Sequence, residues 1–172
     1  MKSLARTLTA IAATLTVGLA AAQGSYPDKP ITVIVPFPPG VVDGYARLIA
    51  TKASAILGQP MVVKNQAGAG QRIGTDAVAK AAPDGYTIGV ITNAGVVSGP
   101  ALSTKVPYDP RKDLTYLAMS FESHYLVNTQ PSSGITTVAQ LQQKAKAAPG
   151  KLTFGSTGMG TGFHLAIERF VN

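Results

Sequence analysis

The sequence contains no cysteine and only two histidines in 172 residues. The absence of cysteine excludes disulfides, thiolate metal sites and a lipid anchor attached through cysteine. His124 and His164 are too few and lie too far apart in the sequence to indicate a zinc site. We therefore expect neither a metal nor a cofactor in this chain.

Charged residues are also scarce, at 13% of the sequence, and the formal net charge is +7. The basic residues are scattered and are not interleaved with aromatic residues, which argues against binding to nucleic acid. A weak attraction for small anions is more consistent with this charge.

A long apolar run occurs only near the N-terminus. It covers residues 8–20, follows Lys2 and Arg6, and ends in small residues at Ala20-Ala21-Ala22. The run is shorter than the roughly 20 residues that a transmembrane helix needs, and its flanks are typical of a secretory signal peptide. The sequence thus predicts cleavage after about Ala22 and a mature protein in the bacterial periplasm.

Residues 32–47 form the stretch most typical of a ligand site. The β-branched run at 31–35 predicts a strand buried on both faces, and the prolines that follow end it. Gly40 allows a tight turn, and Asp43 is expected as the N-cap of the next helix. A helix N-terminus after a strand offers free N–H groups and the positive end of the helix dipole to a carboxylate or phosphate.

Strands and helices alternate along the rest of the chain, which predicts an α/β protein built from parallel βαβ units. Further strands are expected at 61–64, 86–92, 114–119, 125–128 and 152–154, and helices around 73–81, 138–145 and 165–170. Gly58 and Pro60 are expected to end the first helix. Residues 121–124 show no clear periodicity and are the candidate crossing between two lobes.

Two glycine-rich loops leave alternative functions open. The loop at 68–74 differs by one residue in its glycine spacing from the dinucleotide-binding fingerprint. Asn93 ends the next strand, at the position where that fingerprint has an acidic residue to bind the ribose. A nucleotide-binding Rossmann-like protein is therefore one alternative. The loop at 155–158 lacks the spacing of a nucleophile elbow. Ser156, His164 and Asp43 could still be imagined as the triad of a secreted α/β hydrolase-like enzyme. A capping role suits Ser156 and Thr161 equally well.

Several ordered motifs resemble one family. They are Tyr26-Pro-Asp-Lys-Pro-Ile, Val35-Pro-Phe-Pro-Pro-Gly, Ala46-Arg-Leu, Leu57-Gly-Gln-Pro, Ala81-Ala-Pro-Asp-Gly-Tyr-Thr, Pro107-Tyr-Asp-Pro, Pro149-Gly-Lys-Leu and Phe154-Gly-Ser. Together they resemble the Bug family of periplasmic solute receptors, the substrate-binding proteins of tripartite tricarboxylate transporters. The match runs from Tyr26 to Asn172 and covers about the first half of a family member.

The resemblance implies a type II periplasmic-binding-protein fold, with two lobes, mostly parallel sheets and a second lobe that is truncated in this chain. The expected domains are a signal peptide at 1–22, a first ligand-binding lobe at 23–121 without its C-terminal return segments, and the beginning of a second lobe at 122–172. In such a fragment, the apolar faces of Leu165, Ile167 and Phe170 are expected to lack covering partners.

The implied function is that of a receptor and not of an enzyme. A carboxylated organic anion is expected between the lobes, with membrane transporter subunits of the tripartite tricarboxylate type as partners, and a periplasmic sensor-kinase domain remains a further open alternative. The implied ligand-binding residues are Phe37, Pro38, Pro39, Gly40 and Asp43 in a first loop, Thr92, Asn93 and Ala94 after the third strand, and Ser156, Thr157, Gly158, Thr161 and His164 in a second loop. The family usually has a second glycine and more residues before the acid, so the first loop is expected to be shorter here.

Overall fold

The computed structural model describes residues 25–102, 105–122 and 124–171. Three parallel strands form its sheet in the order β2-β1-β3, namely β1 (Ile31–Val35), β2 (Met61–Asn65) and β3 (Thr87–Gly89). The α/β class and the parallel sheet that the sequence predicted are confirmed. The predicted signal peptide lies outside the described residues.

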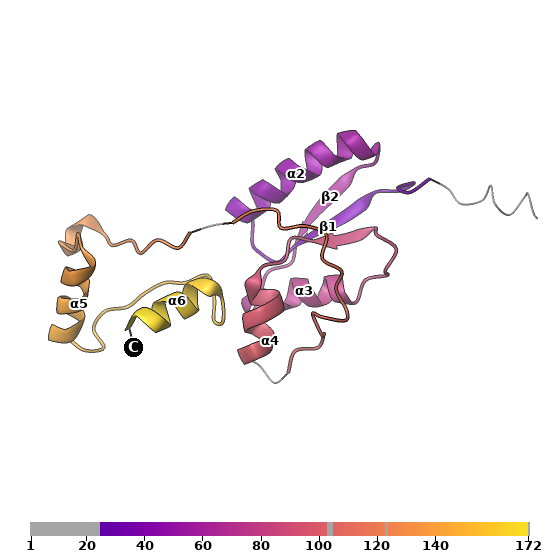
Figure 1. Cartoon of the computed structure of the whole chain (residues 1–172). Coiled ribbons are helices and arrows are strands. Elements are labelled where there is room, and N and C mark those ends of the chain that lie inside the picture. The colour runs from indigo at the N-terminus through magenta and orange to yellow at the C-terminus, as the bar shows by residue number, and fades with distance from the viewer. Residues whose placement is uncertain (1–24, 103–104, 123, 172) are drawn as a thin grey trace, which may run out of the picture.

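Two helices connect these strands, and they lie on opposite sides of the sheet (Figure 1). α2 (Val41–Leu57) connects β1 to β2, and α3 (Arg72–Ala79) connects β2 to β3. Since β-α-β connections are right-handed, the second connection, which returns across β1, covers the opposite face. The central strand is therefore buried on both faces, as its β-branched sequence predicted.

Gly58 ends α2 in a left-handed conformation, with φ 68°, and its N–H donates to the Ser54 carbonyl oxygen at 3.0 Å. A glycine adopts this conformation without the steric penalty of a Cβ, so the predicted helix end is confirmed. Ala46 and Ala50 face the sheet from α2 and are buried against it. Their small side chains allow the helix to lie close to β1 and β2.

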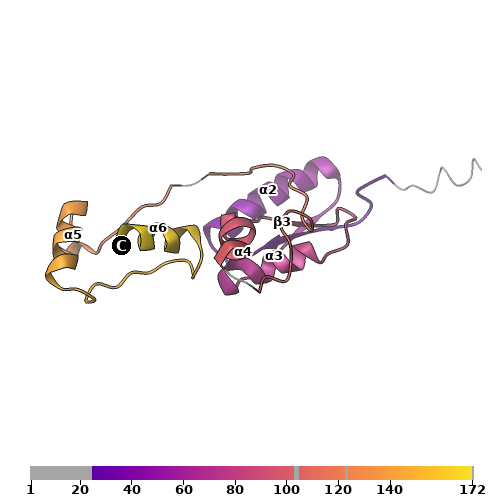
Figure 2. The ribbon, with the colours of Figure 1, turned by 60° about the horizontal axis from the view of Figure 1, so that its bottom comes forward.

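Short helical turns follow the second and third strands. They are η1 (Ala69–Gln71), the π-helical turn η2 (Ala94–Ser98) and α4 (Gly99–Leu102). Further along the chain come η3 (Pro131–Ser133), α5 (Val138–Ala147) and α6 (Gly162–Val171). α5 lies well away from the sheet, whereas the loop before α6 returns toward α4 (Figures 1 and 2).

Three of the predicted strands are wrong. Residues 114–119, 125–128 and 152–154 have no regular secondary structure, and β3 is shorter than the predicted 86–92. A strand forms only when a neighbouring strand completes its hydrogen-bond ladder, and the described residues provide no neighbour for these segments. Their apolar side chains are exposed as a result, including Leu117 at 78% and Leu126 at 76%.

The chain passes α2 before it leaves the sheet. The Tyr45 hydroxyl donates to the Ser120 carbonyl oxygen, and the Tyr45 and Phe121 rings meet edge to face with centroids 4.9 Å apart. These contacts lie next to the predicted crossing at 121–124, of which residue 123 is outside the described residues. None of the described helices combines the length and the hydropathy that a membrane span requires.

Candidate functional site

The N-terminus of α2 carries no side-chain cap. Gly40 is the N-cap residue, and its carbonyl oxygen accepts from the Gly44 N–H at 2.8 Å. Asp43 is thus the third residue of the helix, and its predicted role as N-cap is wrong because the first helical hydrogen bond already begins at Gly40. Within the described part of the chain, the N–H groups of Val41 and Val42 consequently have no side-chain acceptor at the end of the proline-rich loop.

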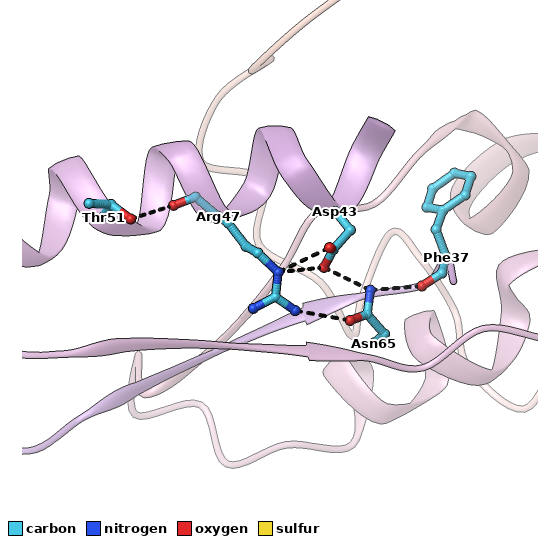
Figure 3. A network of polar contacts seen from close by, with 5 residues as sticks. All are labelled: Phe37, Asp43, Arg47, Thr51 and Asn65. Carbon is cyan, nitrogen blue, oxygen red and sulfur yellow. Dashed lines mark hydrogen bonds and ion pairs between the residues drawn. The ribbon is translucent and has the colours of Figure 1, made fainter. Parts of the chain in front are cut away.

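Asp43 belongs instead to a polar network with Arg47 and Asn65 (Figure 3). Arg47 Nε lies 3.0 Å from both carboxylate oxygens of Asp43, and Asn65 Nδ2 donates to Asp43 Oδ1 at 2.9 Å. Asn65 Nδ2 also donates to the Phe37 carbonyl oxygen at 3.0 Å, while Asn65 Oδ1 accepts from Arg47 Nη2 at 3.2 Å. The network therefore joins the proline-rich loop, the first turn of α2 and the end of β2.

The charge of Asp43 is balanced within this network. The hydrogen bond from Arg47 lowers the pKa of the Asp43 carboxyl below its ordinary value of 3.8, and the bond from Asn65 acts in the same direction, while burial opposes both. The residue is only 7% exposed. Asp43 is thus an ionised carboxylate whose oxygens are occupied by protein donors, which is suited to holding the loop in place.

The segment after β3 is also tied to its surroundings. The Thr92 hydroxyl donates to Gln71 Oε1 and accepts from the Ala94 N–H at 3.3 Å. Ala94 is buried, and Asn93 is exposed. Behind this turn, the Tyr108 hydroxyl donates to the Gly95 carbonyl oxygen at 2.6 Å, and burial raises the pKa of Tyr108.

The second predicted loop leads into α6 through a threonine cap. Thr161 is 1% exposed, its Oγ1 donates to the Gly158 carbonyl oxygen at 2.7 Å, and the same oxygen accepts from the His164 N–H at 3.4 Å. Ser156 Oγ accepts from the Gly158 N–H at 3.4 Å, and Thr157 Oγ1 lies 3.2 Å from Thr161 Oγ1. The capping role predicted for Thr161 is confirmed, whereas Ser156 accepts its hydrogen bond from Gly158, within the same loop.

The structure brings two of the three predicted segments together. Ser98 Oγ donates to the Gly160 carbonyl oxygen at 2.6 Å, which places the second loop against η2 and next to the segment after β3. The first loop forms its own network with Asn65, and among the described residues no hydrogen bond joins it to the second loop. A surface groove of about 780 Å³ between α2 and β2 includes Arg47 but none of the predicted ligand residues.

Sequence reasoning missed four residues of these networks, which are Arg47, Asn65, Gln71 and Ser98. Arg47 lies four residues after Asp43 on one helix, a spacing at which an ion pair could have been predicted. Asn65 ends a strand at the carboxyl edge of a parallel sheet, where ligand-site residues gather. For Gln71 and Ser98 the sequence carries no comparable signal, because their partners lie 21 and 62 positions away.

Catalytic and metal chemistry gain no support in the described part of the chain. His164 Nε2 lies 3.6 Å from Glu168 Oε1, and Asp43 is paired with Arg47, so the imagined triad with Ser156 is not assembled. No three of the described histidine and acidic side chains gather into a group that could hold a metal ion.

The fold and the loops at the carboxyl edge of its sheet define a class of α/β binding proteins, and solved structures support this class. One structure described as a periplasmic transporter shares 36% identity with a TM-score of 0.71, over 85% of this chain and 49% of its own length. The R. palustris protein Rpa4515, solved with adipate, shares 27% identity with a TM-score of 0.70 over the same shares.

The family model described as "Tripartite tricarboxylate transporter family receptor" matches residues 45–172, and the chain belongs to this family. A UPF0065 protein from the tcbD-tcbE intergenic region of Pseudomonas sp. (strain P51) is 40% identical over 164 residues, which are 94% of this chain and 48% of that protein. BugT of Bordetella pertussis is 39% identical over 159 residues, covering 90% and 49%. The chain thus spans about half the length of the curated relatives it matches, and its family is one of receptors and not of enzymes.

Proposed function

We propose that this chain is part of a periplasmic receptor that captures a carboxylated organic anion and delivers it to a tripartite tricarboxylate-type membrane transporter. The observation that carries the proposal is the N-terminus of α2, where the first N–H groups have no side-chain cap and the nearby Asp43 charge is balanced by Arg47. A relative of similar fold was solved with adipate, a dicarboxylate. The predicted signal peptide would place the receptor in the periplasm.

The physical argument depends on hydrogen bonds to an ionised ligand. A micromolar affinity requires about 8 kcal/mol, whereas a helix dipole contributes only about 0.3–1 kcal/mol. Charge-assisted hydrogen bonds contribute roughly 1.5–3 kcal/mol each, so several N–H donors aimed at carboxylate oxygens are the main term. We propose two lobes, at 23–121 and 122–172, which supply these donors from both sides of the ligand.

The test removes one donor without disturbing the helix. Val41 is the first helical residue and is 92% exposed, and proline is tolerated at this position because the N–H takes no part in the helix. We expect Val41→Pro to weaken adipate binding by about tenfold or more, since one charge-assisted hydrogen bond is lost. Val41→Ala keeps the N–H and is the matched control.

Binding is measured by titrating the isotope-labelled chain with adipate and following the amide resonances of residues 42–44 and 161–164, which the parent chain and both variants share. Adipamide, which has the same length but no charge, is the ligand control. The proposal is supported if adipate causes saturable shifts, adipamide does not, and Val41→Pro weakens the binding of adipate. Equal shifts with adipamide, or no saturation with adipate, contradict it.

A further inference from the structure

Gln71 stands in a backbone conformation that side chains normally avoid. Gly68, Ala69, Gly70 and Gln71 have successive φ values of 126°, 48°, 62° and 76°. Glycine enters this region freely, but for alanine and glutamine the Cβ atom is crowded there. Strained residues of this kind persist where the surroundings hold them, and they cluster at functional sites.

Capping does not explain the residue. Gln71 is the N-cap of α3, yet its side chain makes no capping hydrogen bond. A glycine would begin the helix at the same backbone angles without strain. The glutamine side chain must therefore serve something other than the start of α3.

The side chain is buried and points its oxygen at a predicted ligand segment. Gln71 is 7% exposed, and its Oε1 accepts from the Thr92 hydroxyl, which in turn accepts from the Ala94 N–H. The backbone carbonyl of Gln71 is held as well, because Thr75 Oγ1 donates to it at 2.9 Å. The amide nitrogen Nε2 has no hydrogen-bond partner among the described residues, although the side-chain Oε1 and the backbone carbonyl oxygen of Gln71 are both hydrogen-bonded.

Gln71 also lies where two predicted ligand segments meet. The neighbouring Gly70 is so close to the second loop that a Cβ added to it would lie 2.6 Å from the Met159 carbonyl oxygen. On its other side, Gln71 bonds to Thr92 at the end of the third strand. A donor at this position would face an anion held between the segment after β3 and the loop before α6.

We propose that Gln71 is a ligand-binding residue whose Nε2 donates a hydrogen bond to a carboxylate oxygen of the organic anion. The inference rests on the proposed function and adds a residue to it. The backbone at Gln71 places the amide at the carboxyl edge of the sheet, and the bond from the Thr92 hydroxyl to Oε1 leaves Nε2 as the free end of the amide.

Three variants of the full chain test this role, with adipate as the probe. Gln71→Glu keeps the shape and the oxygen that accepts from Thr92, but it replaces the donor by a negative charge. Gln71→Gly removes the side chain together with the strain. Ala69→Gly relieves a similar positive φ, of 48°, without removing a polar group, and it is the matched control.

We expect Gln71→Glu and Gln71→Gly each to weaken adipate binding by about tenfold or more, as the loss of a hydrogen bond to a charged group does. Ala69→Gly should bind like the parent chain, and thermal unfolding should show that all three variants are folded. Parent-like binding by Gln71→Glu overturns the inference, because it would show that Gln71 only orients Thr92. A parent chain that binds no adipate contradicts the proposed function itself, which separates the two failures.

Discussion

Ser98 and Gly160 lie 62 positions apart, yet the Ser98 hydroxyl donates a 2.6 Å hydrogen bond to the Gly160 carbonyl oxygen. Ser98 is the last residue of η2, and Gly160 immediately precedes Thr161, which caps α6. The bond therefore fastens the second loop to the elements that follow β3. It places residues from the middle and from the C-terminal part of the described chain side by side.

Replacing Ser98 by alanine should loosen this attachment. Ser98 is 7% exposed and Gly160 is half-buried, so the change leaves the Gly160 carbonyl oxygen without its partner at a site partly shielded from water. We expect the free energy of unfolding to fall by about 1 kcal/mol. Urea denaturation measures this change, and amide hydrogen exchange at residues 160–165 should become faster. Ser132→Ala, on an exposed turn, is the control, and an equal effect of both substitutions would contradict the contact.

The Asp43 network should make stability sensitive to acid. The pKa of Asp43 is lowered in the folded chain, chiefly by Arg47, from an ordinary value of 3.8. A lowered pKa means that the ion pair stabilises the fold above the unfolded pKa and that this stabilisation is lost as the pH falls through the folded pKa. Between pH 6 and pH 3, which bracket the ordinary carboxyl value of about 3.9, Asp43→Asn should therefore lose less stability than the parent chain.

Urea denaturation at the two pH values measures this difference, and Asp113→Asn is the control because the Asp113 carboxylate accepts from the Asp109 N–H, whereas Arg47 pairs with Asp43. The lowered pKa values of Asp84 and Asp109 give every variant some remaining acid sensitivity. Identical pH dependence of the parent chain and Asp43→Asn would show that the Asp43–Arg47 pair does not persist in solution.

The close approach of the second loop to Gly70 can be tested by adding a methyl group. Gly70 has φ 62°, and a Cβ there would lie 2.6 Å from the Met159 carbonyl oxygen. Gly134 has a similar φ of 67°, but nothing lies within 4 Å of the added atom. Both alanine variants should be destabilised by about 1–2 kcal/mol through backbone strain, and Gly70→Ala should lose more because Met159 must also move. Thermal unfolding of the two variants measures the difference, and equal losses would mean that the loop does not pack on Gly70.

Local sequence signals determined most of the elements around the sheet. The β-branched run before three prolines specifies β1, and the glycine at position 58 specifies the end of α2, because both depend on backbone preferences within a few residues. The helices α3, α5 and α6 also lie where apolar residues recur at helical spacing. These features supported the α/β class, and family motifs spread along the chain supported the receptor family before any contact was known.

Only the tertiary structure decided which residues distant in the sequence contact one another. The segments at 114–119, 125–128 and 152–154 have strand-like sequences but remain irregular, since a strand exists only with a neighbour to complete its ladder. Asp43 has a sequence position suited to a cap, yet Asn65 and Arg47 engage its carboxylate, because the helix begins at Gly40 and β2 ends beside it. Gln71 lies in a glycine-rich loop whose sequence does not indicate a partner for its side chain, and its contact with Thr92 arises when parallel strands bring their carboxyl ends to one edge. Sequence therefore determined the elements with local causes, whereas contacts between distant residues required the folded chain.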